Sequence, residues 1–250
     1  LGQRPVGGWL QAVQSEREHR ETRVMPIVLQ ERTVRWLLLL AAGVVSLLGL
    51  VAELVHQLVP SSHSPLLPLL SLSVEGNFPT WYSSLLLAGC GVLLLLVAAA
   101  VRQRGGQFRR RWALLGAVFL YMSLDEAVEL HEHLGELVEL HGVLYFSWVV
   151  PAGLAVLLLG LAYLPFLKHL PVRTRWRFIV AGLIYVGGAL VLELPLGWWA
   201  ERAGRHNLVY GLIDWVEETM EMFGATLFLL ALLDHLRELG DLRLAAAEPS

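Results

Sequence analysis

Six apolar stretches, separated by polar connections, are spaced along this chain. Each contains about 20 residues, which as a helix crosses the ~30 Å hydrocarbon layer of a bilayer. Short connections favour antiparallel packing of consecutive helices. The pattern therefore predicts an all-α polytopic membrane protein with a single bundle of six transmembrane helices over residues 35–236. The predicted spans are residues 35–55, 83–101, 112–133, 144–166, 177–199 and 211–233.

The polar flanks are predicted to be extensions of this bundle. Residues 1–34 are expected to be a cytoplasmic N-terminal extension, and residues 237–250 a cytoplasmic tail. Met25 precedes the first apolar stretch closely and is a candidate for the natural start. A signal peptide is not expected, because the first apolar run is too long and lacks a cleavage site of small residues.

One connection, residues 56–82, is long enough to have a structure of its own. Pro60, Pro65 and Pro68 exclude a long regular helix there. Its leucines favour a segment that lies on the membrane surface or packs over the mouth of the bundle as a structural lid. Trp81 has the position of an aromatic anchor at the membrane interface.

Composition supports the membrane assignment. The 250 residues are 56% hydrophobic and 16% charged, with a mean hydropathy of +0.57, a balance typical of polytopic membrane proteins rather than soluble domains. The net charge of −3 leaves no basic face for nucleic acid, so the lipid bilayer is the expected partner. Cys90 is the single cysteine, which excludes a disulfide framework and a thiolate metal motif.

Basic residues are distributed asymmetrically among the connections. Lys and Arg are concentrated in residues 102–111 and 167–177, whereas residues 56–82 and 134–143 contain neither. Residues 200–209 are the exception, with two arginines. Since Lys and Arg accumulate in cytoplasmic loops, both termini are predicted to be cytoplasmic, in the inner or plasma membrane.

Acidic residues within the predicted spans are the most unusual feature of the chain. Each carboxylate at the bilayer centre costs roughly 2.5–3.5 kcal/mol, so such residues usually pair, face the bundle interior or mark a site. With the predicted orientation, acids and histidines from four spans lie at one depth in the outer half of the membrane. The candidate site residues are Glu53, His56, Asp125, Glu126, Glu129, His131, Glu132, His133, Glu193, Glu217, Glu218 and Glu221.

Helical phase groups these residues further. At 100° per residue, a continuous helix over 112–133 places most of its acids and His133 within a sector of about 120°, with His131 pointing elsewhere. On the sixth span, Asp214 and the three glutamates share about 100°. Glu53 and His56 have the Glu-x-x-His spacing of helical di-metal sites.

Too few basic side chains are available in the outer half to neutralise these acids, so shared protons or bound metal are expected to do so. The mixture of His and carboxylate favours Fe, Mn or Zn as cofactor. The zinc-protease, nucleophile-elbow and phosphate-loop signatures are absent. Plainer interpretations are a hydrogen-bonded structural cluster and, near residue 132, solvated acids at a helix end.

The favoured function is an integral membrane metalloprotein with a mono- or di-metal site. As an enzyme it would be an oxidoreductase or hydrolase that acts on a lipid-soluble substrate. The alternatives are a proton- or cation-coupled transporter or channel that uses the acids as a relay, and a structural accessory subunit of a membrane complex.

Overall fold

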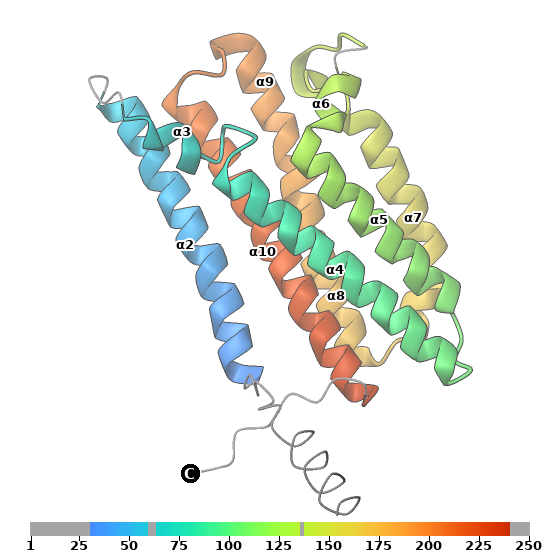
Figure 1. Cartoon of the computed structure of the whole chain (residues 1–250). Coiled ribbons are helices and arrows are strands. Elements are labelled where there is room, and N and C mark those ends of the chain that lie inside the picture. The colour runs from blue at the N-terminus through green and yellow to red at the C-terminus, as the bar shows by residue number, and fades with distance from the viewer. Residues whose placement is uncertain (1–30, 60–63, 136–137, 241–250) are drawn as a thin grey trace, which may run out of the picture.

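The computed structural model describes residues 31–59, 64–135 and 138–240, and their regular secondary structure is entirely helical. The predictions for residues 1–30 and 241–250, including the start at Met25, lie outside the described residues. The elements are α2 (Glu31–Leu58), α3 (Leu66–Leu70), α4 (Phe78–Gln103), α5 (Arg109–Val128), α6 (Leu130–Gly135), the short 3-10 turn η1 (Gly142–Leu144), α7 (Val149–His169), α8 (Val172–Val186), the π-helical turn η2 (Gly187–Leu192), α9 (Glu193–Ala203) and α10 (Leu208–Glu238) (Figure 1).

Four described helices are long and apolar enough to cross a membrane. They are α2, α4, α7 and the continuous helical segment Val172–Ala203, which comprises α8, η2 and α9. The chain is therefore a multi-pass membrane protein. The predicted spans 112–133 and 211–233 fall on α5 and α10, which are not among the four, so the count of six spans and the cytoplasmic termini stay predictions.

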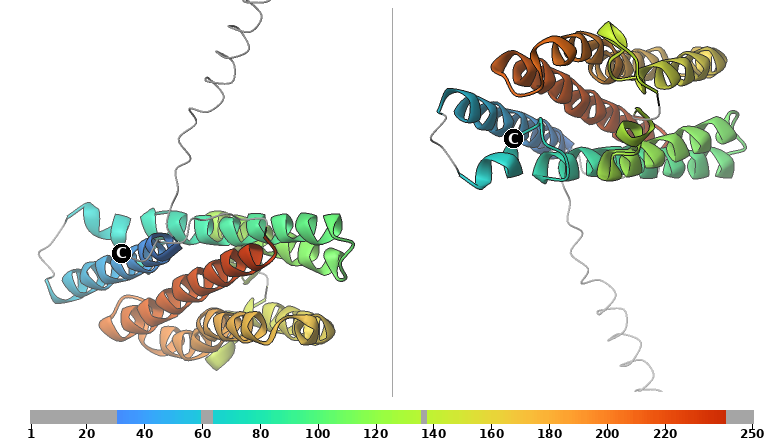
Figure 2. Two further views of the ribbon diagram at one scale, coloured as in Figure 1. Left: turned by 90° about the horizontal axis from the view of Figure 1, so that it is seen from below. Right: turned by 90° about the horizontal axis from the view of Figure 1, so that it is seen from above.

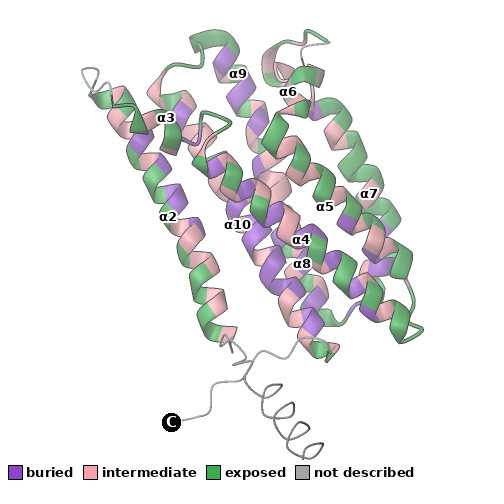
Figure 3. Ribbon diagram, in the orientation of Figure 1, coloured by how far each residue is buried: buried purple, intermediate pink, exposed green. Residues whose placement is uncertain are grey.

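The long helices lie side by side around α10, which packs against α2, α4 and α8. The α4–α5 hairpin lies on one side of α10 and the helices from α7 to α9 lie on the other (Figure 2). Both basic connections are at the lower end of Figure 1, and the connections that follow α2, α5 and α9 are at the upper end. Burial is concentrated along α10 and α4, whereas most of α7 is exposed (Figure 3).

Small residues allow the closest helix contacts. Gly91 on α4 and Gly116 on α5 lie against each other, and a β-carbon on either would be 3.1 Å from the carbonyl oxygen of the other. Further along the same pair, the Ser84 and Ser123 hydroxyls each donate to the other's backbone carbonyl at 2.8 Å. Gly224 on α10 lies against the backbone of α8, where a β-carbon would be 2.7 Å from the Tyr185 nitrogen.

The lower end of the bundle is closed by aromatic packing and by ion pairs. Trp112 packs edge-on against Phe166 with ring centroids 4.7 Å apart. Asp234 on α10 accepts from Arg35 of α2 at 2.9 Å and also from Arg177 of α8. This carboxylate therefore joins three helices through charge-assisted hydrogen bonds.

The third predicted span is not one continuous helix, which is a correction to the sequence analysis. Helix α5 ends at Val128, and Glu129 has the left-handed conformation, with φ of 58°. Helix α6 then starts at Leu130 in a new direction. The phase calculated for a straight helix therefore does not apply beyond residue 128. A left-handed residue other than glycine is uncommon and marks a local constraint.

The long connection contains one short helix, α3, and then returns over the upper end of the bundle. Leu72 packs onto Gly49 of α2, where a β-carbon would be 3.0 Å from Leu72 Cδ1. The Asn77 side chain accepts from the backbone N–H of Thr80 at 3.2 Å and so caps α4. The segment packs against α2 and α4 and contributes to the lining of the cavity described below. That it covers the mouth of the bundle stays a prediction; we call it the lid, and Pro60 lies outside the described residues.

Candidate functional site

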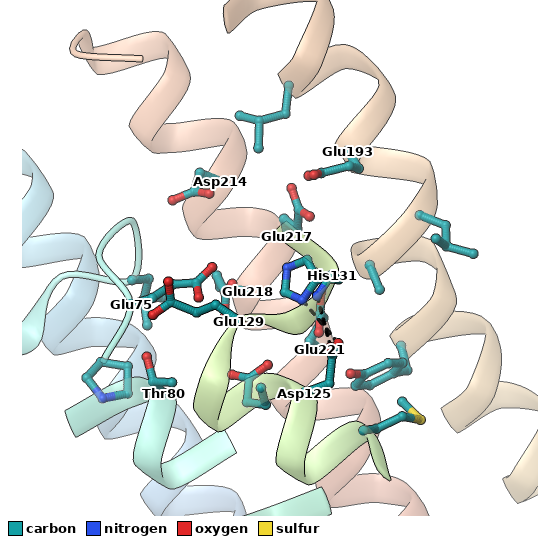
Figure 4. A pocket seen from close by; sticks show the side chains of 18 of the residues that line it. Glu75, Thr80, Asp125, Glu129, His131, Glu193, Asp214, Glu217, Glu218 and Glu221 are labelled. Atoms are coloured by element: carbon teal, nitrogen blue, oxygen red, sulfur yellow. Dashed lines mark hydrogen bonds and ion pairs between the residues drawn. The ribbon is translucent and has the colours of Figure 1, made fainter. Parts of the chain in front are cut away.

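A cavity of about 1280 Å³ lies inside the bundle and extends from its upper end past its middle, and side chains from nearly every long helix line it. Its polar part is defined by acids and histidines that come from α2, the lid, α5, α6, α9 and α10 (Figure 4). These residues are Glu53, His56, Glu75, Asp125, Glu126, Glu129, His131, Glu193, Asp214, Glu217, Glu218 and Glu221, together with His206 from the connection between α9 and α10. We call this part the acidic end.

The same cavity continues toward the lower end of Figure 1 between apolar side chains. On α5 these precede Asp125, and on α10 they follow Glu221; because the two helices run in opposite directions, the apolar positions come to the same level. We call this part the apolar end. Its lining includes Leu115, Val118, Phe119, Met122, Ala152, Ala155, Val156, Leu159, Ala181, Ala225 and Phe228.

The acids on α10 occupy one face of that helix. Their spacing of three, four and seven residues places Asp214, Glu217, Glu218 and Glu221 on one side, and all four line the cavity. The neighbouring face binds α2: Trp215 Nε1 donates to the Ser46 carbonyl at 2.9 Å. The seam with α2 therefore fixes the rotation of α10 so that its carboxylates point into the cavity.

A polar chain links α5, α6, α7 and α9 across the acidic end. His131 Nδ1 lies 3.1 Å from Asp125 Oδ2, and the His131 backbone N–H donates to Asp125 Oδ1 at 3.0 Å. The His131 ring contacts Trp148, with centroids 4.8 Å apart. Trp148 Nε1 in turn donates to Glu193 Oε1 at 3.1 Å. The left-handed turn at Glu129 brings His131 back to Asp125 and so makes this chain possible.

Glu193 is positioned by an irregularity in its own helix. It follows η2, and Pro195 lacks the N–H that would donate to the carbonyl four residues earlier. Such π-helical turns are frequent at functional sites. Glu193 is buried, and its hydrogen bond from Trp148 ties α9 to the start of α7.

Two buried carboxylate oxygens at the acidic end accept no hydrogen bond from the described residues. They are Asp214 Oδ2 and Glu217 Oε2. Buried polar atoms without a partner are rare in native structures and call for an explanation, such as a bound ion or water. Both atoms belong to the cavity lining, so they are available to a ligand in it.

The structure brings together ten of the twelve candidate residues named from sequence. His131 was predicted to point away from the other acids of its span, and that prediction is wrong because the helix breaks at Glu129. His133 was predicted to join them, but it is exposed, and its Nδ1 lies 2.8 Å from the Glu129 carbonyl oxygen. It does not line the cavity. The side chain of Glu132 lies outside the described part of the chain.

Several lining residues were not identified as site residues from sequence. Glu75 comes from the lid and Trp148 from the start of α7, where no local motif marks them. Asp214 could have been named as a site residue from the sequence, since its spacing places it on the same helix face as the α10 glutamates. Arg205 is the lining arginine, and its guanidinium lies 4.9 Å from the centre of the Phe146 ring. The acidic end is thus poor in cations, as the distribution of Lys and Arg predicted.

The expected resident transition-metal centre is not supported. Among the described residues, no three His, Cys, Asp or Glu side chains are close enough together to hold a metal ion. Glu53 and His56, which have the di-metal spacing, both line the cavity. Glu53, however, accepts from Gln57 Nε2 at 3.0 Å and lies against Gly211 of α10. The carboxylates surround a wide space instead of converging on one point.

Comparison with known proteins gives one partial relative. Undecaprenyl-diphosphatase 1 of Streptomyces coelicolor is 36% identical over 67 residues, which are 27% of this chain and 21% of that protein. The similarity therefore spans about a fifth of the relative's length. No solved structure matches the chain. Residues 36–236 match a family described as a domain of unknown function, DUF8692, and since that match covers most of the chain, the chain belongs to the DUF8692 family.

Proposed function

We propose that this protein is a membrane-embedded hydrolase of a lipid-linked phosphate. The lipid chain would occupy the apolar end of the cavity, and the phosphate head would lie at the acidic end with a divalent cation. This proposal narrows the hydrolase interpretation of the sequence to one substrate class.

The observation that carries the proposal is the division of one cavity into an acidic and an apolar end. Ligand sites are usually apolar with a few convergent polar groups. Here the polar groups are all at one end, and the space of about 1280 Å³ is larger than the usual 300–1,000 Å³ of small-molecule sites. A ligand that fills such a space has a polar head and a long apolar body, as a lipid has.

A cation is required by the charge of the acidic end. Carboxylates repel a phosphate unless a positive charge lies between them, and Arg205 is the lining arginine. Mg²⁺ is commonly held by one or two carboxylates together with substrate phosphates, without an all-protein cage. That mode agrees with the absence of a three-ligand group among the described residues. Asp214 and Glu217, each with a buried oxygen available, are the candidate ligands.

The chemistry proposed is the attack of water on phosphorus. A bond forms from the water oxygen to phosphorus, and the bond from phosphorus to the leaving phosphate breaks. When bound, the cation would supply charge neutralisation at the phosphate oxygens. The His131 ring is the proposed acceptor of the water proton, because it lines the cavity and Asp125 holds its orientation through a contact of 3.1 Å to Nδ1.

The partial relative supports this choice of substrate class. Its name states that it hydrolyses a lipid diphosphate. The match spans 27% of this chain and 21% of the relative, and it makes undecaprenyl diphosphate the first substrate to test.

The transporter alternative gains no support from the structure. Within the apolar end, Phe119 and Phe228 stack with centroids 4.9 Å apart, and the Trp112–Phe166 pair lies beyond the lining toward the lower end. Asp234, near the lower end, is bound by two arginines and does not line the cavity. The acids therefore do not form a polar path through the described part of the bundle.

The test is phosphate release from undecaprenyl diphosphate by the purified protein in lipid nanodiscs. We expect phosphate release to depend on Mg²⁺ and to be abolished by a chelator. Glu217→Gln is expected to reduce the rate at least tenfold, which corresponds to about 1.4 kcal/mol. Glu139→Gln is the control, because Glu139 is exposed and outside the cavity lining. A folded protein that releases no phosphate with Mg²⁺ or Mn²⁺ would refute the proposal and leave the structural-subunit interpretation.

A further inference from the structure

We propose that the apolar chain of the ligand enters the cavity sideways, from the hydrocarbon layer of the bilayer, through a portal between α5 and α7. This inference rests on the proposed function only for the nature of the head group. The portal itself follows from how these two helices are joined and from what lies between them.

The two helices are held together at their ends. At the lower end, the Tyr163 hydroxyl donates to the Arg111 carbonyl at 2.8 Å, beside the Trp112–Phe166 pair. At the upper end, the Ser147 hydroxyl donates to the Gly135 carbonyl at 2.7 Å. These contacts tie α7 to α5 and α6 above and below one stretch of both helices.

Between the two ties, the facing side chains line the cavity from opposite sides. From α5 they are Leu115, Val118 and Met122, and from α7 they are Ala152, Ala155 and Val156. Two of the three residues on α7 are alanines, whose side chains fill little of the space between the helices. In both views of Figure 2, the layer that contains α5 and the layer that contains α7 are separate on this side of the molecule.

The portal opens onto an apolar surface. Tyr121 and Val156 line the cavity and are also 53% and 38% exposed, so the cavity reaches the outside of the bundle here. The exposed side chains around them are apolar on both helices. They are Leu124 on α5 and Leu154, Leu157, Leu158 and Leu161 on α7. A membrane protein presents such a surface to lipid, so the portal faces hydrocarbon.

The apolar surroundings of the portal suit a ligand with a single flexible hydrocarbon or isoprenoid chain. The portal is at the level of the apolar end, and the acidic end lies above it toward the upper end of the bundle. A lipid in the bilayer has the same order, with its head toward the membrane surface and its chain toward the centre. It could therefore pass from the bilayer into the cavity without turning over, and its chain would never cross water.

The first experiment narrows the portal with Ala155→Trp. We measure phosphate release from undecaprenyl diphosphate and from water-soluble isopentenyl diphosphate. The rate with undecaprenyl diphosphate, divided by the rate with isopentenyl diphosphate, is expected to fall about tenfold or more. A misfit of one methylene group in an apolar pocket already has an effect of this size. Leu157→Trp is the matched control on the lipid-facing side of α7, and it should keep the ratio of the unmodified protein. An unchanged ratio in Ala155→Trp would refute the portal.

The second experiment does not depend on hydrolysis. Photoreactive benzoylphenylalanine replaces Val156, or Leu157 as control, and the protein is illuminated in nanodiscs with radiolabelled undecaprenyl phosphate. Crosslinking at position 156 is expected to be saturable and competed by unlabelled undecaprenyl phosphate, whereas crosslinking at 157 should stay proportional to lipid content. Saturable crosslinking without phosphate release would sustain the portal and refute the hydrolase. Phosphate release, together with crosslinking at 156 that is only proportional to lipid content, would sustain the hydrolase and refute the portal.

Discussion

Glu53 on α2 lies directly against the backbone of Gly211 on α10: a β-carbon at position 211 would be 2.7 Å from Glu53 Cγ and closer still to its carboxylate. This contact is the upper attachment of α2 to α10, and the Arg35–Asp234 ion pair is the lower one. Glycine at 211 therefore sets both the position of a buried carboxylate at the acidic end and the approach of two helices.

Gly211→Ala is expected to displace the Glu53 side chain and to lower the thermal midpoint. Overpacking in a well-packed interior typically costs about 1–3 kcal/mol. The matched control is Gly43→Ala on α2, another glycine within a long helix, where a β-carbon would meet nothing within 4 Å. Thermal unfolding in detergent measures both variants. Equal midpoints for the two would mean that Glu53 has room to move and that the contact fixes nothing.

Neighbouring histidines provide a test of the polar chain. His131 contacts Asp125 and Trp148, whereas His133 is exposed and contacts the backbone of Glu129. His131→Ala is expected to lower the rate of phosphate release about 10²-fold or more, the usual contribution of a general acid or base. His133→Ala should keep the rate of the unmodified protein. Similar rates for the two variants would remove His131 from the proposed chemistry.

Glu218→Gln tests whether the acidic end is strained by like charges. Removing one of several neighbouring carboxylates reduces their mutual repulsion. The thermal midpoint without divalent cations is therefore expected to equal or exceed that of the unmodified protein. The increase in midpoint on addition of Mg²⁺ should be smaller in the variant, because fewer carboxylates face the cation. A variant that is equally destabilised with and without Mg²⁺ would show that Glu218 serves packing or hydrogen bonding.

Single cysteines test the predicted orientation in the membrane. In a Cys90→Ala background, Gly142→Cys should react with an impermeant thiol reagent from outside intact cells, and Gly105→Cys should react only after the cells are opened. Both glycines have positive φ and space for a side chain, with nothing within 4 Å of an added β-carbon. They also lie in connections at opposite ends of the bundle. The reverse labelling pattern would place the acidic end on the cytoplasmic side.

The sequence alone predicted the helical membrane fold, because runs of about 20 apolar residues have few other stable structures. It also predicted that acids from separate helices would meet, because a carboxylate in an apolar span is costly unless it is turned inward. Glu217 and Glu193, remote from each other in sequence, are both buried at the acidic end for that reason.

Only the tertiary structure decided which histidine belongs to the site. One residue, Glu129, leaves the helical conformation, and this reverses the roles of His131 and His133 that a straight helix predicts. At the break, Asp125 Oδ1 accepts from the backbone N–H of His131, and the apolar periodicity of the sequence does not record this turn. The same holds for Glu75 and Trp148, which reach the cavity from segments without a motif, and for the apolar end, whose side chains look in the sequence like any other lipid-facing residues.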